Sequence, residues 1–277
     1  MGKHRIRNEL ISANRELKKK RLVALVYFFL RLSVLAILVA QFFNRDYENV
    51  FLCGLTLILF LLPTVFEHRL KIDLPDTLEI IIMLFIYAAW ILGEIRAFYT
   101  TYQGWDTMLH TLNGFLCAAI GFSLVDMLNR EDQFSLELSP AFMAVVAFCF
   151  SMTIGVLWEF FEYGVDYVFL LDMQKDAVLT QISSVMLDPT GGNHPVTIRD
   201  ITDVIVVAGG EEISLGLGGF LDVGIQDTMK DLAVNFVGAV IFSFVGYFYV
   251  KNRGKGWFAK RFIPKVVEQE KPSAGDE

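Results

Sequence analysis

Acidic side chains recur at helical spacing in three parts of the chain, each time with a second polar group nearby. The residues concerned are Asp106 and His110, then Glu159, Glu162 and Asp166, and finally Asp227, Asp231 and Asn235. Within each group the spacing is three or four residues. Side chains at that spacing share one face of an α-helix, so each group predicts a single polar stripe.

Carboxylates gathered at short range raise one another's pKa values unless a cation stands between them. Oxygen-rich sites suit Mg²⁺, Mn²⁺ or Ca²⁺, and a histidine among the ligands also admits Zn²⁺ or iron. A bound metal could polarise a phosphoryl or carbonyl group or activate water. The candidate metal ligands are Asp106, His110, Glu159, Glu162, Asp227 and Asp231.

Acid–base chemistry without a metal is a second reading of the same residues. His110 beside Asp106 could act as a general acid or base with its tautomer fixed. The candidate catalytic residues are Asp106, His110, Glu159 and Asp231. Structural roles compete with both readings, because Asp106 and Asp227 could cap helices and a lone histidine is often a packed, hydrogen-bonded one.

Apolar runs long enough to cross a bilayer must position these stripes. The chain has 277 residues, of which 54% are hydrophobic, and a mean hydropathy of +0.48. A bilayer core of about 30 Å needs about 20 helical residues. Six runs meet or approach that length, namely residues 22–43, 50–66, 78–99, 107–128, 140–170 and 228–250. The sequence therefore predicts an all-α polytopic membrane protein with a six-transmembrane-helix bundle, and a bend at Pro63 near the end of the second helix.

The distribution of Lys and Arg predicts the orientation of these spans. Eighteen of the 24 lie in the two tails and in the loops on the same side, three lie in the opposite loops, and three lie within spans. The basic side is predicted to be cytoplasmic. The expected segments are a basic cytoplasmic arm at 1–21, five spans within 22–170, an extracytoplasmic loop at 171–227, the sixth span at 228–250, and a cytoplasmic tail at 251–277 with a disordered end.

This topology brings the three stripes to one level. The third and fifth spans run outward and the fourth and sixth run inward, so all three stripes fall in the outer leaflet. Ionisable groups inside a membrane are costly and mark functional sites. Arg31, in the middle of the first span, is an exception that needs a partner elsewhere, and Glu94 is one candidate.

The long loop at 171–227 carries strand signals. β-Branched runs flank Ala208-Gly209-Gly210-Glu211, a pattern typical of a hairpin turn, and the preceding PVTIRDI is a further strand candidate. We expect a small β-rich extracytoplasmic insert between the fifth and sixth helices.

The segments WDTMLH, WEFFEY and DTMKDLAVNFVGA resemble the YjdF-like bacterial integral membrane proteins, a family without an established activity. A looser similarity links the chain to VanZ-like membrane proteins, which also carry an acid and a His opening one helix, an acid closing the next, and an acid, Asn and Gly on the last. In this chain those residues are Asp106 and His110, Glu159, and Asp231, Asn235 and Gly238. The resemblance covers roughly residues 78–250 and implies the bacterial plasma membrane and the same polar cluster, without a reaction.

Three functions remain open. The first is an envelope protein that binds or processes lipids or lipid phosphates at headgroup depth, with a divalent metal (Mg, Mn or Zn) as possible cofactor. The second is a transporter or ion-conducting protein, which would need polar groups reaching the inner leaflet or an inverted repeat. The third is a non-catalytic envelope protein whose polar cluster is structural. Membrane lipids are the expected partners and nucleic acid is not, while enzyme activity and oligomeric state stay open.

Overall fold

The computed structural model describes residues 2–70, 72–130, 138–252, 259–263 and 265–266. They form two compact units, residues 1–152 with 235–277, and residues 153–234. Two long helices belong to both units, α7 (Pro140–Phe169) and α8 (Ile225–Lys251).

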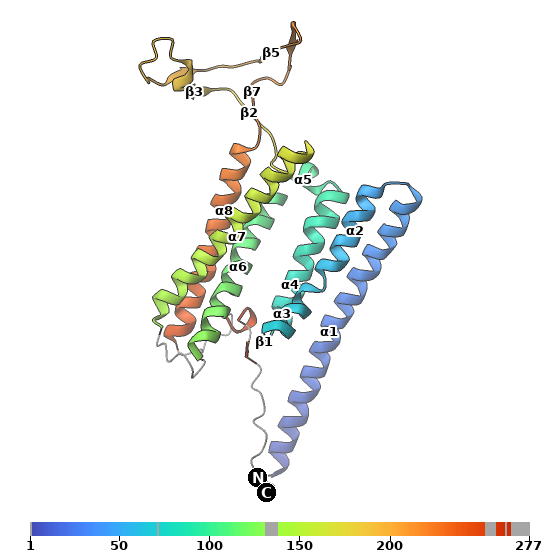
Figure 1. The fold of residues 1–277 in the computed structure, drawn as a ribbon. Coiled ribbons are helices and arrows are strands. Elements are labelled where there is room, and N and C mark those ends of the chain that lie inside the picture. Colours follow the sequence, from blue (N-terminus) through green and yellow to red (C-terminus); the bar gives the residue numbers. More distant parts are fainter. Residues whose placement is uncertain (1, 71, 131–137, 253–258, 264, 267–277) are drawn as a thin grey trace. The chain divides into compact units, whose positions relative to one another are not determined.

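Six helical segments in the described residues are long and apolar enough to cross a membrane, which confirms the six predicted spans (Figure 1). They cover Arg21–Phe43, Tyr47–Arg69, Asp76–Ile95, Trp105–Asp126, Pro140–Phe169 and Ile225–Lys251. The first belongs to α1 (Gly2–Phe43) and the fourth to α6 (Trp105–Arg130). The fifth is one continuous helix, α7.

Proline interrupts the second span. α2 (Tyr47–Leu59) ends just before α3 (Leu62–Leu70), in which Pro63 is the second residue. Proline has no N–H to donate and its ring displaces the carbonyl one turn back, so it is tolerated only in a first helical turn. At the other end, the carboxylate of Asp46 accepts a hydrogen bond from the Asn49 amide at 3.1 Å and caps α2.

The third span changes its helical winding. α4 (Asp76–Tyr87) continues into a π-helix, η1 (Ala88–Ile95). The chain then reverses at Ala97, whose φ of 56° is in the left-handed region, and forms the short helix α5 (Phe98–Thr101). Residues with left-handed φ and Cβ atoms are strained, so tertiary packing must hold this turn.

Two glycines let α6 and α8 approach closely within the first unit. A Cβ at Gly238 would lie 2.0 Å from the Thr111 carbonyl oxygen, and one at Gly114 would lie 2.1 Å from that of Asn235. The side-chain amide of Asn113 donates to Asn235 Oδ1 at 3.3 Å beside this contact. Ser151 of α7 donates to the Gly114 carbonyl at 2.7 Å, so three helices meet here.

The segment after the last span folds back onto the first unit. A short 3₁₀ helix, η3 (Ala259–Arg261), precedes Phe262 and Ile263, which are buried in the main hydrophobic core. The ring of Phe262 packs edge-on against Phe115 with centroids 5.0 Å apart. β8 (Lys265–Val266) then pairs antiparallel with β1 (Ile72–Asp73). The predicted disordered end, residues 268–277, lies outside the described residues.

The second unit contains the small β-rich insert, as predicted (Figure 1). At its base, β2 (Ala177–Leu179) pairs antiparallel with β7 (Phe220–Asp222). Beyond it, β3 (Ile182–Ser184) is followed by the 3₁₀ helix η2 (Val185–Leu187) and pairs with β4 (Val196–Ile198), within the predicted PVTIRDI strand.

The predicted hairpin is confirmed as β5 (Ile205–Ala208) paired with β6 (Glu211–Ser214). Gly209 and Gly210 have φ of 62° and 89°, the positive values that a tight hairpin turn demands at both central positions. Asp203 closes the open end of this hairpin. The hydroxyl of Ser214 and the backbone N–H groups of Gly216 and Val204 donate to its carboxylate, and these hydrogen bonds lower the pKa of Asp203.

The glycine contact predicts a strong response to one methyl group. Gly238→Ala should destabilise the protein by about 1–3 kcal/mol, because the new Cβ meets backbone atoms that cannot rotate away. Thermal unfolding in detergent measures this change. Gly54→Ala is the matched control, since a Cβ there meets nothing within 4 Å. Equal stability of the two variants would contradict the close packing of α6 and α8.

Asp203→Asn should loosen the β5–β6 hairpin at neutral pH, because the amide is a weaker acceptor than the carboxylate. Since the folded pKa is lowered, the stabilisation is present above the unfolded value near 4 and is lost as pH falls through the folded value. Hydrogen exchange of hairpin amides should therefore differ between variant and wild type at pH 7 and converge in acid. Asp200→Asn is the control, and a difference that persists in acid would contradict the assignment.

Candidate functional site

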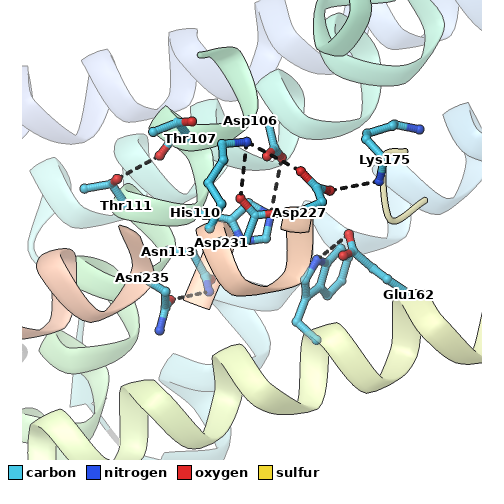
Figure 2. Close-up of polar contacts among 12 residues, drawn as sticks. Asp106, Thr107, His110, Thr111, Asn113, Glu162, Lys175, Asp227, Asp231 and Asn235 are labelled. Carbon is cyan, nitrogen blue, oxygen red and sulfur yellow. Dashed lines mark hydrogen bonds and ion pairs between the residues drawn. The ribbon is translucent and has the colours of Figure 1, made fainter. Parts of the chain in front are cut away.

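Asp106 and His110 lie side by side on the first two turns of α6. Nε2 of His110 lies 3.4 Å from Oδ1 of Asp106, in the i, i+4 arrangement that the spacing predicted (Figure 2). Only 12% of the His110 side chain and 21% of the Asp106 side chain are exposed. The histidine is therefore a largely buried imidazole held beside a carboxylate, the arrangement that fixes a tautomer for metal binding or proton transfer.

Polar groups continue along α6 towards the glycine contact. The hydroxyl of Thr111 donates a hydrogen bond to the Thr107 carbonyl at 2.7 Å, so this hydroxyl has its partner within its own helix (Figure 2). Asn113, one turn after His110, bonds Asn235 of α8 as described above. Asn235 is 1% exposed and its amide also points at Met152 Sδ, 3.6 Å away.

Asp231 is the most deeply buried acid of the described residues in the second unit, with 1% of its surface exposed. Lys230 Nζ lies 3.8 Å from Asp231 Oδ1 and 3.5 Å from Asp227 Oδ1, so one cation serves two acids of α8 (Figure 2). Lys230 is itself half exposed. A buried carboxylate needs such compensation, because its charge is costly away from water.

Asp166 and Asp227 hold the connection between α7 and the insert. Asp166 accepts the backbone N–H groups of Met173 and Gln174 at 2.6 and 2.8 Å. Asp227 accepts that of Lys175 at 2.9 Å (Figure 2). These bonds satisfy backbone donors of the turn that follows α7 and fix it to the first turn of α8. For Asp227, predicted as a metal ligand, the structure supplies a backbone partner.

Glu159 and Glu162 occupy one buried face of α7, with 4% and 7% of their surface exposed. Glu162 Oε1 accepts a hydrogen bond from the indole N–H of Trp158 at 2.8 Å (Figure 2). This hydrogen bond from Trp158, one helical turn away, holds the Glu162 carboxylate in one orientation.

Several participants were not predicted from the sequence. Asn113 is not among the predicted site residues, because its bond to Asn235 depends on the approach of α6 and α8. Gln174 and Lys175 carried no signal, because loop residues contribute backbone N–H groups whatever their type. Asp222, 8% exposed, accepts the Gln226 amide at 2.9 Å and caps α8 from the strand before it.

The arrangement contains two kinds of acid. Asp166, Asp222 and Asp227 accept backbone N–H groups and shape the chain. Asp106 faces an imidazole, a group that can bind a metal or carry a proton. Asp231, in the second unit, offers a further carboxylate, and carboxylates and imidazoles are donor types that could hold a metal ion.

Comparison with known protein families finds one match, which covers residues 26–252 and is described as a predicted membrane protein family (DUF2238). The match includes all the polar groups described above and agrees with the YjdF-like resemblance. The looser VanZ-like similarity stays a prediction. No curated protein and no solved structure matches the chain. Because the matched region spans most of the chain, the protein belongs to the DUF2238 family of predicted membrane proteins.

Proposed function

We propose that Asp106, His110 and Asp231 bind one divalent cation at a membrane surface, and that the protein binds or processes lipid phosphates there. The observation that carries the proposal is the largely buried Asp106–His110 pair. Burying an acid and an imidazole together is costly, and such pairs inside membrane spans are functional sites more often than packing elements.

Helix continuity supports the inclusion of Asp231. Asn235 lies beside Asn113 in the first unit, and α8 runs without a break from Ile225. Asp231 precedes Asn235 by four residues and His110 precedes Asn113 by three. At a rise of 1.5 Å per residue, Asp231 lies about 6 Å before Asn235 along the axis of α8, and His110 lies about 5 Å before Asn113 along the axis of α6. α6 and α8 run in the same direction, since Gly114 and then Phe122 of α6 meet Asn235 and then Gly246 of α8.

The same argument applies to Glu159. Ser151 bonds the Gly114 carbonyl, and Glu159 follows Ser151 by eight residues on the continuous helix α7, while Asp106 precedes Gly114 by eight. α7 runs opposite to α6. Asp106 and Glu159 therefore each lie about 12 Å along their own helix from the Ser151–Gly114 hydrogen bond, towards the same side of the membrane. We therefore keep Glu159 as a candidate ligand or catalytic acid. Glu162 and Asp227 have partners in Trp158 and Lys175 and are candidates only if those bonds open.

Two carboxylates and one imidazole favour Mn²⁺ or Zn²⁺ over Mg²⁺, which prefers oxygen ligands and retains several waters. A cation held by three side chains keeps positions for water or substrate oxygen. At the end of a membrane span the anionic oxygens within reach are those of lipid headgroups. The metal would neutralise charge on a phosphoryl oxygen, and His110 would be placed to exchange a proton.

For the location, we propose the bacterial plasma membrane with both termini cytoplasmic and the β-rich insert outside. The bias of Lys and Arg towards one set of loops and tails supports this orientation. The site then faces outward, away from the cytoplasm, at the depth of the outer headgroups.

A transporter is a weaker alternative, although the first unit does bury polar groups beyond Asn235. Ser123, Asp126 and Ser243 lie further along α6 and α8. Phe122 and Phe242, both fully buried, occupy the helices between them and the asparagine pair. Such packed rings oppose a continuous polar path. The third function, a non-catalytic envelope protein, would use the acids only to hold the insert, as Asp166 and Asp227 do.

Metal content tests the site. Wild-type protein purified in detergent and exposed to Mn²⁺ or Zn²⁺ should retain about one ion per chain, measured by elemental mass spectrometry. Asp106→Asn and Asp231→Asn should each lose at least about 90% of it, because an amide is a much poorer ligand than a carboxylate. Asp172→Asn is the control, since this exposed acid lies outside the donor set.

Thermal unfolding of each variant without metal separates loss of ligands from loss of fold. Variants that keep the wild-type metal content would overturn the site, as would wild-type protein that binds no divalent ion. If the metal binds but vesicles containing a long-chain lipid phosphate do not bind more tightly with metal than without, the substrate class is wrong.

Orientation is testable with single cysteines in a background where Cys53, Cys117 and Cys149 are replaced. Glu211→Cys, on the exposed β5–β6 hairpin, should react with an impermeant maleimide on intact cells. Lys260→Cys, after the last span, should react only after permeabilisation. The reverse pattern would show that the orientation is the opposite of the one proposed. Labelling of both sites on intact cells would show that an even number of membrane crossings separates them, which contradicts the six-span topology.

A further inference from the structure

A cavity of about 660 Å³ lies in the first unit, between the first half of the α1 span and the α3–α4 turn. Its lining includes Tyr27 and Arg31 from α1, Glu67 from α3, and Glu79 from α4. None of these residues belongs to the Asp106–His110 site. The volume is that of a site for a small ligand, and the lining joins apolar and charged groups as ligand sites do.

Arg31 has no carboxylate partner among the described residues, and Glu94 does not pair with it. Its guanidinium instead lies over the ring of Tyr27, 4.9 Å from the centroid. The Tyr27 hydroxyl is buried and lies beside the carboxylate of Glu79. A guanidinium that faces a ring and no carboxylate is a donor without an anionic acceptor, inside a segment where such a group is costly.

Carboxylates line the other end of the cavity. They are Glu67, Asp73, Asp76 and Glu79. Glu67 accepts the Leu74 amide at 3.0 Å, and the other three face the cavity with no basic residue of its lining other than Arg31. The cavity therefore has an excess of negative charge at one end and a single positive charge deeper inside.

The order of these groups along the membrane axis follows from the helices. α1 and α4 run in the same direction, since Tyr27 lies near Glu79 and, further on, Ser33 donates to the Tyr87 hydroxyl at 3.4 Å. Arg31 is four residues beyond Tyr27, and Leu35 four beyond Arg31, so each step is about 6 Å on one helix face. Along the axis of α1 the cavity therefore presents first the carboxylates, then the tyrosine hydroxyl, then the guanidinium and last the leucine side chain.

This order matches a phospholipid with an amine headgroup, read from the amine through the phosphate to the acyl chains. Phe28, Leu32 and Leu35 line the cavity and are about half exposed, so its deep end opens on the apolar surface of α1. We propose that the cavity binds an ethanolamine phospholipid, with its phosphate on Arg31 and Tyr27, its ammonium among the carboxylates, and its acyl chains along Leu32 and Leu35.

Charge and hydrogen bonding favour this occupant over other lipids. An anionic lipid brings the phosphate but no ammonium, and it meets four carboxylates. A choline lipid carries a positive charge that cannot donate hydrogen bonds. The ethanolamine ammonium has three donors for the acids, and the planar guanidinium can bind the phosphate through two parallel hydrogen bonds.

Native mass spectrometry of the full-length protein in detergent tests the proposal. Wild type should bind phosphatidylethanolamine about tenfold more tightly than phosphatidylglycerol, the effect of a single charged partner of moderate strength. Arg31→Gln should weaken both lipids, because it removes the contact to their shared phosphate. Glu79→Gln should weaken phosphatidylethanolamine but not phosphatidylglycerol, which reduces the preference. A misfolded cavity would not give this split.

Matched controls are Arg45→Gln and Glu48→Gln, two exposed residues outside the cavity near the other end of α1. Both should bind lipids as wild type does. Equal binding of the two lipids by wild type overturns the proposal, and so does an equal loss in Arg45→Gln. Competition by O-phosphoethanolamine as strong as that of the intact lipid would identify a soluble ligand instead of a lipid and would also overturn it.

Discussion

The contact between the backbones of α6 and α8 is the constraint on which the first unit depends. Gly114 and Gly238 bring the helices so close that no Cβ fits between them. Apolar side chains are no better solvated by each other than by lipid, so close packing and buried hydrogen bonds must hold membrane helices together. The Asn113–Asn235 bond and the bond from Ser151 to the Gly114 carbonyl lie at this point and supply that specificity. The contact also fixes the rotation of α6, and with it the direction in which Asp106 and His110 face.

Polar residues within the spans divide by what they bond. Asp166 and Asp227 each satisfy backbone donors of the turn after α7, and Asp46 and Asp222 cap helices. These acids solve the general problem of helix ends, where N–H and C=O groups lack intrahelical partners. Asp106 pairs with a side chain that can titrate or bind a metal, and Arg31 lies over an aromatic ring instead of an acid. Asp106 and Arg31 are costly to bury and do not shape the chain. The proposed metal site and the proposed lipid site therefore rest on these two residues.

Much of the architecture follows from the sequence, because length and hydrophobicity determine what can cross a bilayer. All six spans were predicted, and the β5–β6 hairpin was predicted from its two central glycines. Helical spacing also gave the face shared by Asp106 and His110. Spacing could not say which acids meet loop amides, since residues such as Lys175 contribute only their backbone. Nor could it place Phe262 and Ile263, a short apolar pair in a basic tail, in the core.

That burial has a consequence for how the protein is assembled in the cell. Phe262 packs against Phe115 of α6, yet it follows every span in the sequence and is synthesised after all of them. Until it arrives, the surface of α6 that it covers must be occupied by lipid or by a chaperone. Synthesis of α6 and completion of the core around it are therefore separate steps, because the order of translation places the tail after the helix. A nascent chain that has inserted all six helices is still one docking event short of its native packing.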